Sequence, residues 1–550
     1  MGFVISILTL VLSVPAFAGD KDFNFKVFDK MARERAALGG KVLKTTPKKV
    51  IQTDFTLTDN PDSLAKDEFR GHLGEMFCHK TSAEMGCLDD DTLKGKRPSE
   101  AFIPGFFPGN MKYTLALDEM KLEARIPNKE QPWSDDYWAI DRGVLAHRYA
   151  GESGYDWESS VNYVLSEQGH LSYILNLPES EKYQAIDGLS PAEKYDLIIG
   201  TITADNYAGW LALPRPLEDE IYVNGMELQG KVAGFLAPNQ WIQGQYYFDS
   251  RGEVESWMGI CHGWSTAAIQ MPRPLKPVDV LSADATTWVR FYPAEIKALG
   301  SYLWAQSAPR SRFIGGRCNS KEVQYDELSG AILDENLECF DTNPKDWHTI
   351  VTNYIGGHQR SFVMDVTFDY EVWNQPVLGY EYRFFRVDDE QQKPVDSLKE
   401  ALVEYKGFKD KDIFRNVRRA DPSTKYIVGV MMEVQYLVEN TPRQYLADSY
   451  ERDNITEAYY TYDLELNEDL EIVGGEWHEE SHPDFLWVHD AEDKAISDRE
   501  KYSGYNYADI KAAVNFNKPL HPTLQDMAQK ASKQGEVLGS IIETLFEKAQ

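Results

Sequence analysis

Cysteine, positive charge and long apolar runs are scarce in this chain. Only 5 of its 550 residues are cysteine, and 57 Lys and Arg stand against 88 Asp and Glu, which gives a formal net charge of −31. An acidic chain without a basic stripe repels nucleic acid and anionic lipid, so we exclude both as partners. After residue 18 no apolar run approaches the length that spans a bilayer, so we expect no further membrane segment.

The one long apolar run lies at the N-terminus. Residues 2–17 are mostly apolar, and Ala16 and Ala18 flank Phe17 in an A-x-A cleavage pattern. No Lys or Arg precedes the run, so an uncleaved anchor is the alternative to a signal peptide. We predict a signal peptide over residues 1–18 and a protein that is secreted or located in the periplasm or cell wall, where disulfides form.

The five cysteines divide into two local pairs and a remainder. Cys78 with Cys87, and Cys318 with Cys339, are close enough in sequence to close short loops, each disulfide contributing about 2–4 kcal/mol. Cys261 is left over. An odd cysteine in a secreted protein either pairs with another chain or stays a free reactive thiol, and the glycine-rich and aromatic surroundings of Cys261 favour the free thiol.

Cys261 opens a predicted helix. Apolar residues recur at helical spacing after it until Pro272 ends the pattern. The dipole and unpaired N–H groups of a helix N-terminus favour thiolate over thiol. Gly259 and Gly263 would let a substrate backbone approach the sulfur, since they lack side chains. The alternative is a core cysteine on an alanine-rich helix.

A second group of reactive residues follows. Residues 347–355 and 361–366 are strand-like, and the two glycines at 356–357 predict a two-residue hairpin turn between them. In that register His348 faces Asp365, with Cβ atoms about 4.5–5.5 Å apart. The alternative is a local hydrogen-bonded pair with no catalytic role.

Together these residues make a candidate catalytic triad. Cys261 is the nucleophile, His348 the base that takes and returns the proton, and Asp365 the carboxylate that orients His348. Asn374 is an alternative orienting residue. His262 is a weaker base, because a residue next to Cys261 on a helix points about 100° away.

Further helices and strands are predicted around this group. A capping box at Ser190 and Glu193 predicts one helix, and residues 293–304 and 524–546 predict two more. Residues 426–438, 458–466 and 470–476 alternate as antiparallel strands. We therefore predict four parts: the signal peptide 1–18, an N-terminal cap or removable pro-region over 19–125, a catalytic domain over 126–500 and a C-terminal helical segment over 501–550.

Several segments resemble one known family. Residues 372–379, Val-Trp-Asn-Gln-Pro-Val-Leu-Gly, are similar to the surface motif of the transglutaminase elicitor family, known from secreted oomycete cell-wall transglutaminases and bacterial relatives. Residues 132–138, 261–264, 346–348, 474–477 and 482–487 resemble the family in the same order, so the similarity extends from about 130 to 490. Leu378 and residues 380–382 depart from the motif, which affects recognition as an elicitor but not the chemistry.

The resemblance implies a fold and a reaction. The expected fold is α+β, with a papain-like or transglutaminase-like thiol-enzyme core, the nucleophile at a helix N-terminus packed on an antiparallel sheet, and an N-terminal layer. The implied nucleophile is Cys261, with a histidine–aspartate partnership that we assign to His348 and Asp365. The expected activity is that of a protein-glutamine γ-glutamyltransferase, which transfers the acyl group of a glutamine side chain to a lysine or polyamine amine through a cysteine thioester.

Two other functions remain alternatives. The same triad with water as acceptor would make a thiol amidase, deamidase or cysteine protease, and a secreted binding protein would need no reactive thiol. Trp257 and Trp264 beside Cys261, with Trp347 beside His348, could wall a channel for the amine or simply pack a core. No cofactor is required; the family makes calcium dependence plausible, but no loop defines a metal site.

Overall fold

The computed structural model describes eleven ranges of the chain. These are residues 23–44, 106–109, 111–150, 163–164, 166–202, 236–237, 240, 257–315, 324–333, 342–366 and 372–550. The predicted signal peptide and the two predicted disulfides, Cys78–Cys87 and Cys318–Cys339, lie outside the described residues. Within these ranges no helix is both long and apolar enough to cross a membrane.

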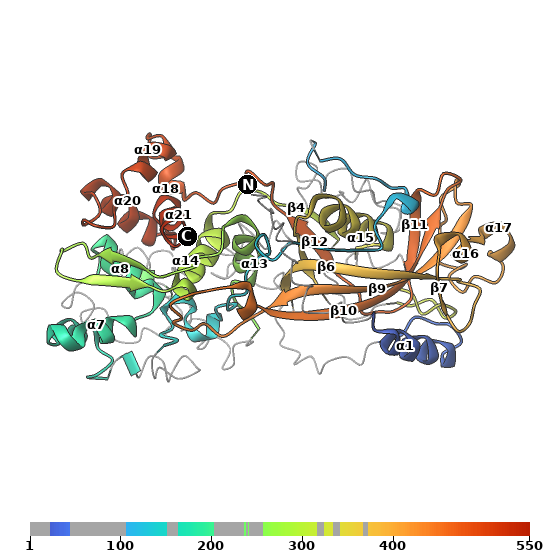
Figure 1. Ribbon diagram of the computed structural model, residues 1–550, viewed down its shortest axis with the longest axis horizontal. Coiled ribbons are helices and arrows are strands. Elements are labelled where there is room, and N and C mark those ends of the chain that lie inside the picture. Colours follow the sequence, from blue (N-terminus) through green and yellow to red (C-terminus); the bar gives the residue numbers. More distant parts are fainter. Residues whose placement is uncertain are drawn as a thin grey trace, which may run out of the picture.

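Most of the helices gather at one end of an elongated molecule, and the large sheet with a few shorter helices forms the other (Figure 1). The α-helices are α1 (Phe25–Ala37), α6 (Leu171–Leu175), α7 (Glu179–Asp187), α8 (Pro191–Ile199), α13 (Cys261–Gln270), α14 (Pro293–Ser307), α15 (Pro344–Val351), α16 (Leu398–Ala401), α17 (Tyr405–Phe408), α18 (Asp498–Lys501), α19 (Tyr507–Ala512), α20 (Pro522–Ser532) and α21 (Gly539–Lys548). The short 3₁₀ turns are η3 (Leu117–Glu119), η4 (Ile140–Arg142), η5 (Val144–Ala146) and η7 (Tyr450–Arg452), and η6 (Thr352–Gly357) is a π-helix.

Ten strands form one antiparallel sheet. Its main path runs β11 (Ile472–Trp477), β10 (Asn454–Leu466), β9 (Tyr426–Val438), β6 (Asn374–Phe385), β5 (Val363–Asp365), β12 (Phe485–Val488) and β4 (Arg312–Gly315). Off this path, β1 (Glu123–Arg125) and β7 (Pro394–Val395) pair with β6, and β8 (Val403–Glu404) pairs with β9. A separate hairpin joins β2 (Val278–Leu281) to β3 (Trp288–Phe291). The predicted mixture of helices with an antiparallel sheet is confirmed.

Several local predictions agree closely with the structure. Strand β9 has the predicted bounds, and β10 and β11 contain most of the other two predicted strands. The Ser190 capping box forms, with the Ser190 side chain accepting from the backbone of Glu193 and the Glu193 side chain accepting from that of Ser190. The predicted C-terminal helix is two helices, because Gly535 between them adopts a φ of +76°.

The described residues form two large apolar cores. The first joins α8, α13, α14, α20 and α21 at the helical end. The second lies between α15 and the strands β6, β9 and β10. A small third cluster, formed by Phe313, Val363, Val372, Phe485 and Trp487, lies where β4, β5, β6 and β12 meet the helical end. Two members of this third cluster, Val372 and Trp487, contact residues of the site described below.

Residues 23–44, the first described segment, pack against the large sheet. Phe23 and Phe28 pack against Phe385 and Met431, so α1 covers part of the sheet. The guanidinium of Arg35 is buried and bonds to the ring of His478, whose other nitrogen lies 2.9 Å from Asp463. The backbone of Leu43 then pairs with residues 478–480. Removing this segment would expose both apolar surface and buried charge.

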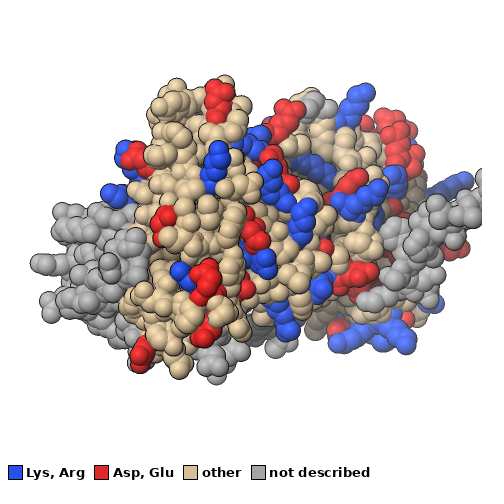
Figure 2. All heavy atoms as spheres, turned by 60° about the vertical axis from the view of Figure 1, so that its left-hand side comes forward, with Lys and Arg blue, Asp and Glu red and all other residues tan. Residues whose placement is uncertain are grey.

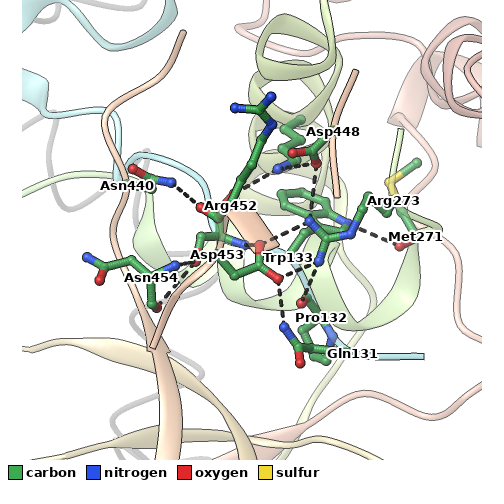
Figure 3. A network of polar contacts seen from close by, with 12 residues as sticks. Gln131, Pro132, Trp133, Met271, Arg273, Asn440, Asp448, Arg452, Asp453 and Asn454 are labelled. Carbon is green, nitrogen blue, oxygen red and sulfur yellow. Dashed lines mark hydrogen bonds and ion pairs between the residues drawn. The ribbon is translucent and has the colours of Figure 1, made fainter. Parts of the chain in front are cut away.

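A polar network fixes the helical end to the start of β10 (Figure 3). Arg273, just after α13, binds Asp453 through two hydrogen bonds of 2.6 and 3.0 Å. Asp453 also accepts from the Gln131 side chain at 2.7 Å and the Ser134 backbone at 3.0 Å. At the same end, the Trp133 indole donates to the Met271 carbonyl, which closes the C-terminus of α13. Three separate segments are therefore held together by one carboxylate.

We expect Arg273→Ala to lower the free energy of unfolding by about 3–5 kcal/mol, because it leaves the buried Asp453 carboxylate without its main counter-charge. Arg290→Ala is the matched control. It breaks the Arg290–Asp279 pair, which is 37% and 45% exposed, and should cost no more than about 1 kcal/mol. Urea unfolding followed by tryptophan fluorescence measures both; equal midpoints for the two variants would contradict the structural role of Arg273.

Candidate functional site

Cys261 is the first residue of α13, as predicted. Its thiol is free, and the residue is 6% exposed. The Asn374 side-chain amide donates a hydrogen bond to the sulfur at 3.3 Å, and the sulfur lies 3.9 Å from the carbonyl oxygen of Val372. Cys261 thus contacts the segment 372–379 that carries the family resemblance.

The glycines around Cys261 are needed for packing. A Cβ on Gly259 would collide with the backbone oxygen of Tyr137, and one on Gly263 with the backbone oxygen of Ser301 in α14. The backbone N–H of Ile260 donates to that Tyr137 oxygen at 2.7 Å. The prediction that these glycines open a path to the sulfur is wrong; they let residues 137–140 and α14 approach α13 closely.

Three strand ends meet beside Cys261. Asp365 at the end of β5 pairs with Asn374 at the start of β6, and β12 lies on the other side of β5. One carboxylate oxygen of Asp365 accepts from the Trp373 backbone N–H at 3.1 Å. The indole N–H of Trp487 in β12 donates to the Asn374 side-chain oxygen at 2.8 Å. Asp365 and the alternative residue Asn374 are therefore side by side in one sheet, with Asn374 in direct contact with Cys261.

The predicted hairpin around His348 is wrong. Residues 344–351 form α15, and η6 continues from it through both glycines. Asn343 caps α15, its side chain accepting from the backbone of Asp346 at 2.9 Å, and Pro344 occupies the first turn. The β-branched run at 349–352 suggested a strand, but the cap and proline select a helix. The facing register of His348 and Asp365 is lost with the hairpin.

His348 lies in the second core, against β10. Its Nδ1 forms a 2.7 Å hydrogen bond with the Tyr462 hydroxyl, and its ring stands edge-on to Tyr382 with centroids 4.7 Å apart. Burial lowers the pKa of His348 to about 3, so its ring is neutral near pH 7. In the described part of the chain, no hydrogen bond joins His348 to Cys261 or Asp365.

Two of the three candidate channel tryptophans are core residues. Trp264 and Trp347 are fully buried, and the Trp264 indole donates to the Trp133 carbonyl at 2.9 Å. Trp257 is only partly buried, next to the third cluster. Tyr137 and Trp373, whose ring centroids lie 5.8 Å apart, are also partly exposed. The partly exposed aromatic residues thus include one selected candidate, Trp257, and two residues that the sequence interpretation did not select for this role, Tyr137 and Trp373.

The thiol is poorly ionised in the resting structure. Burial raises the pKa of Cys261 to about 11, and the charges of Glu439 and Asp365 act in the same direction. Hydrogen bonds from the Asn374 side chain and backbone oppose the rise without cancelling it. Desolvation of the anion thus acts against the activation that the helix N-terminus is predicted to give.

Within the described ranges, no group of three His, Cys, Asp or Glu side chains is placed to hold a metal ion. On the face that Figure 2 shows, Lys and Arg side chains lie among Asp and Glu side chains and do not gather in a separate patch.

Comparison with known proteins gives a match to a family model and a similarity to a solved structure. The model of the transglutaminase elicitor family matches residues 249–518, a range that includes Cys261, His348, Asp365, Asn374 and Trp487. A solved structure, the GP42 transglutaminase from Phytophthora sojae, is similar at 19% identity and a TM-score of 0.39, over 77% of this chain and 94% of that one. No curated protein matches the chain.

We expect the alkylation rate of Cys261 by iodoacetamide to rise about tenfold per pH unit from pH 7 to 9.5 without levelling. A thiol with a pKa of about 11 is ionised to the order of 10⁻⁴ at pH 7, and only the thiolate reacts. Mass spectrometry of the peptide that contains Cys261 gives the rate at this residue alone. A plateau below pH 8 would contradict the raised pKa and indicate a preformed ion pair.

Proposed function

We propose that this chain, which belongs to the transglutaminase elicitor family, is a protein-glutamine γ-glutamyltransferase acting through a thioester on Cys261. The observation that carries the proposal is the hydrogen bond between Cys261 and Asn374. It joins a free thiol at a helix N-terminus to the segment that the family match contains. A structural core cysteine would have no need of a buried amide that donates to its sulfur.

The proposed reaction has two displacement steps. The Cys261 sulfur attacks the side-chain carbonyl carbon of a glutamine, forming a C–S bond, and the C–N bond breaks as ammonia leaves with the proton that the thiol gave up. An amine nitrogen then attacks the thioester carbon and the C–S bond breaks. The proton lost by the amine returns to the sulfur, so the enzyme ends in its starting form.

We propose His348 as the proton carrier and Asp365 as a supporting carboxylate. The Tyr462 hydroxyl can donate to the Met432 sulfur at 3.7 Å, in which case the Nδ1–H of His348 donates to the Tyr462 oxygen. Nε2, which has no hydrogen-bond partner among the described residues, is then the free acceptor. No contact joins His348 to Cys261 in the resting structure, so the assignment rests on the residue order and is tested below against His262.

The proposed substrates are proteins that present glutamine, with lysine or polyamine amines as acceptors. The partly exposed rings of Tyr137 and Trp373 offer apolar surface near Cys261 for the stem of an amine. We propose action outside the cytosol after removal of residues 1–18, with residues 126–500 as the catalytic domain and 501–550 as a C-terminal helical segment. The buried contacts of α1 and the pairing of β1 with β6 favour a permanent cap over a removable pro-region.

We expect the protein to incorporate a fluorescent primary amine into a glutamine-containing protein, and Cys261→Ala to abolish the labelling because it removes the nucleophile. The assay measures covalent fluorescence and released ammonia together, over millimolar amine and with or without calcium. Ammonia release without labelling under every condition would reject the transferase and favour the deamidase.

We expect His348→Ala to slow amine transfer by about 10²–10⁴-fold, the usual contribution of a general acid–base. His358→Ala is the control, because His358 is exposed. Asp365→Ala should slow amine transfer less than His348→Ala does. If His262→Ala stops transfer while His348→Ala retains it, the proton carrier is His262 and the assignment of His348 is wrong. Initial rates at saturating amine, with circular dichroism to check folding, measure all four variants.

A further inference from the structure

Two hydrogen bonds in series connect a tryptophan to the reactive sulfur. The indole N–H of Trp487 donates to the Asn374 side-chain oxygen at 2.8 Å, and the Asn374 side-chain nitrogen donates to Cys261 Sγ at 3.3 Å. The three residues come from β12, β6 and α13, which are far apart in sequence. All three side chains are buried, with exposures of 4%, 1% and 6% in that order.

Trp487 determines which end of the Asn374 amide faces the sulfur. An indole N–H is a donor and has no acceptor capacity, so the atom of Asn374 that it meets is the oxygen. The NH₂ group is then directed at Cys261. An asparagine without such a neighbour could turn by 180° and present its oxygen, which would repel a thiolate.

Trp487 is itself held firmly. Its backbone pairs with Phe313 of β4 on one side and Val363 of β5 on the other. Its ring packs in the third cluster with Phe485 and Val372. A side chain fixed by two strand neighbours and a cluster of apolar residues can hold the amide in one orientation.

The other groups around the sulfur oppose its ionisation. Burial raises the pKa of Cys261, and the charges of Glu439 and Asp365 raise it further. The groups that lower it in the described part of the chain are the side chain and backbone of Asn374. A hydrogen bond to an anion is stronger than one to a neutral thiol, so the Asn374 contact tightens as the thiolate forms.

We propose that Asn374 is a catalytic residue that stabilises the Cys261 thiolate by hydrogen bonding, and that Trp487 is a positioning residue that keeps the donor end of the amide on the sulfur. The inference rests on the proposed role of Cys261 as nucleophile. It goes beyond that role because it names the group that stabilises the ionised thiol, the neutral amide of Asn374 in the segment 372–379.

The test is the rate of Cys261 alkylation by iodoacetamide in the full chain between pH 7.5 and 9.5. Loss of one hydrogen bond to a buried anion shifts its pKa by about one to two units, so Asn374→Ala should react about 10- to 100-fold more slowly at each pH. Truncation to alanine opens space for the reagent, so better access alone would give a faster rate. The direction of the change thus separates the hydrogen bond from a steric effect.

Two further variants remove less volume than truncation to alanine. Asn374→Asp replaces the donor by a carboxylate of the same shape, and should react more slowly still than Asn374→Ala because of charge repulsion. Trp487→Phe keeps the aromatic ring but removes the N–H, and should give a smaller slowing than Asn374→Ala. Trp133→Phe is the matched control, since it removes a buried indole N–H that bonds to the Met271 carbonyl at the other end of α13. Its alkylation rate should equal that of the unaltered protein.

The outcomes separate this inference from the proposed function. Alkylation needs no acyl transfer, so slowing in Asn374→Ala and Asn374→Asp supports the inference even if no amine is incorporated. Unchanged or faster alkylation in folded Asn374→Asp overturns it, whatever the transferase activity. If Cys261 is alkylated at the same rate in Trp487→Phe as in the Trp133→Phe control, while the Asn374 variants are alkylated slowly, the positioning role of Trp487 is wrong.

Discussion

The contact between α13 and the strand ends is the constraint on which the site depends. Cys261 reaches Asn374 because its helix is fixed at both termini. At the N-terminus, Gly259 and Ile260 lie directly against the Tyr137 backbone, and at the C-terminus Arg273 is bound by the buried Asp453. Small residues at one end and a paired charge at the other leave α13 little freedom to shift along the sheet.

Burial gives the site its electrostatic character. Cys261, Asp365 and Asn374 are buried away from water. In the protein interior charge–charge interactions are stronger than in water, and an unpaired anion is costly. Two carboxylates near one thiol make the thiolate less stable, so ionisation depends on donors aimed at the sulfur. The amide of Asn374 is neutral, and it can stabilise the anion without forming an ion pair that would itself need desolvation.

Sequence reasoning succeeded where a signal was local. The helix from Cys261 ends before Pro272, the Ser190 capping box forms, and β9 has its predicted bounds, because caps, prolines and strand alternation act over a few residues. The same reasoning failed at residues 347–357. There the β-branched run pointed to a strand, while the helix signal, Asn343 followed by Pro344, lay just before the segment considered.

The site itself could be predicted only in part. Cys261 was selected by counting cysteines, and Asp365 was selected by a hairpin register that the structure does not form. In the structure Asp365 ends β5 and pairs with Asn374, whose side chain contacts Cys261 at the start of α13. The contact of Asn374 with the sulfur depends on the pairing of β5, β6 and β12, which no local pattern reports. Trp264 and Trp347 were candidates for a channel because tryptophan suits both cores and binding walls, and only the fold decides between them.

Burial that disfavours the thiolate also protects a thioester. An acyl group on Cys261 partitions between an amine and water, and water is far more concentrated, so a transferase must keep water from the carbonyl carbon. Cys261 is a buried residue, 6% exposed, and its sulfur contacts the buried side chain of Asn374, which limits the access of water on that side. In the proposed reaction, the partly exposed rings of Tyr137 and Trp373 would offer apolar surface to the stem of an amine. In the proposed transferase, the raised pKa of the resting thiol and a preference for an amine over water have one physical cause, the removal of water from the sulfur.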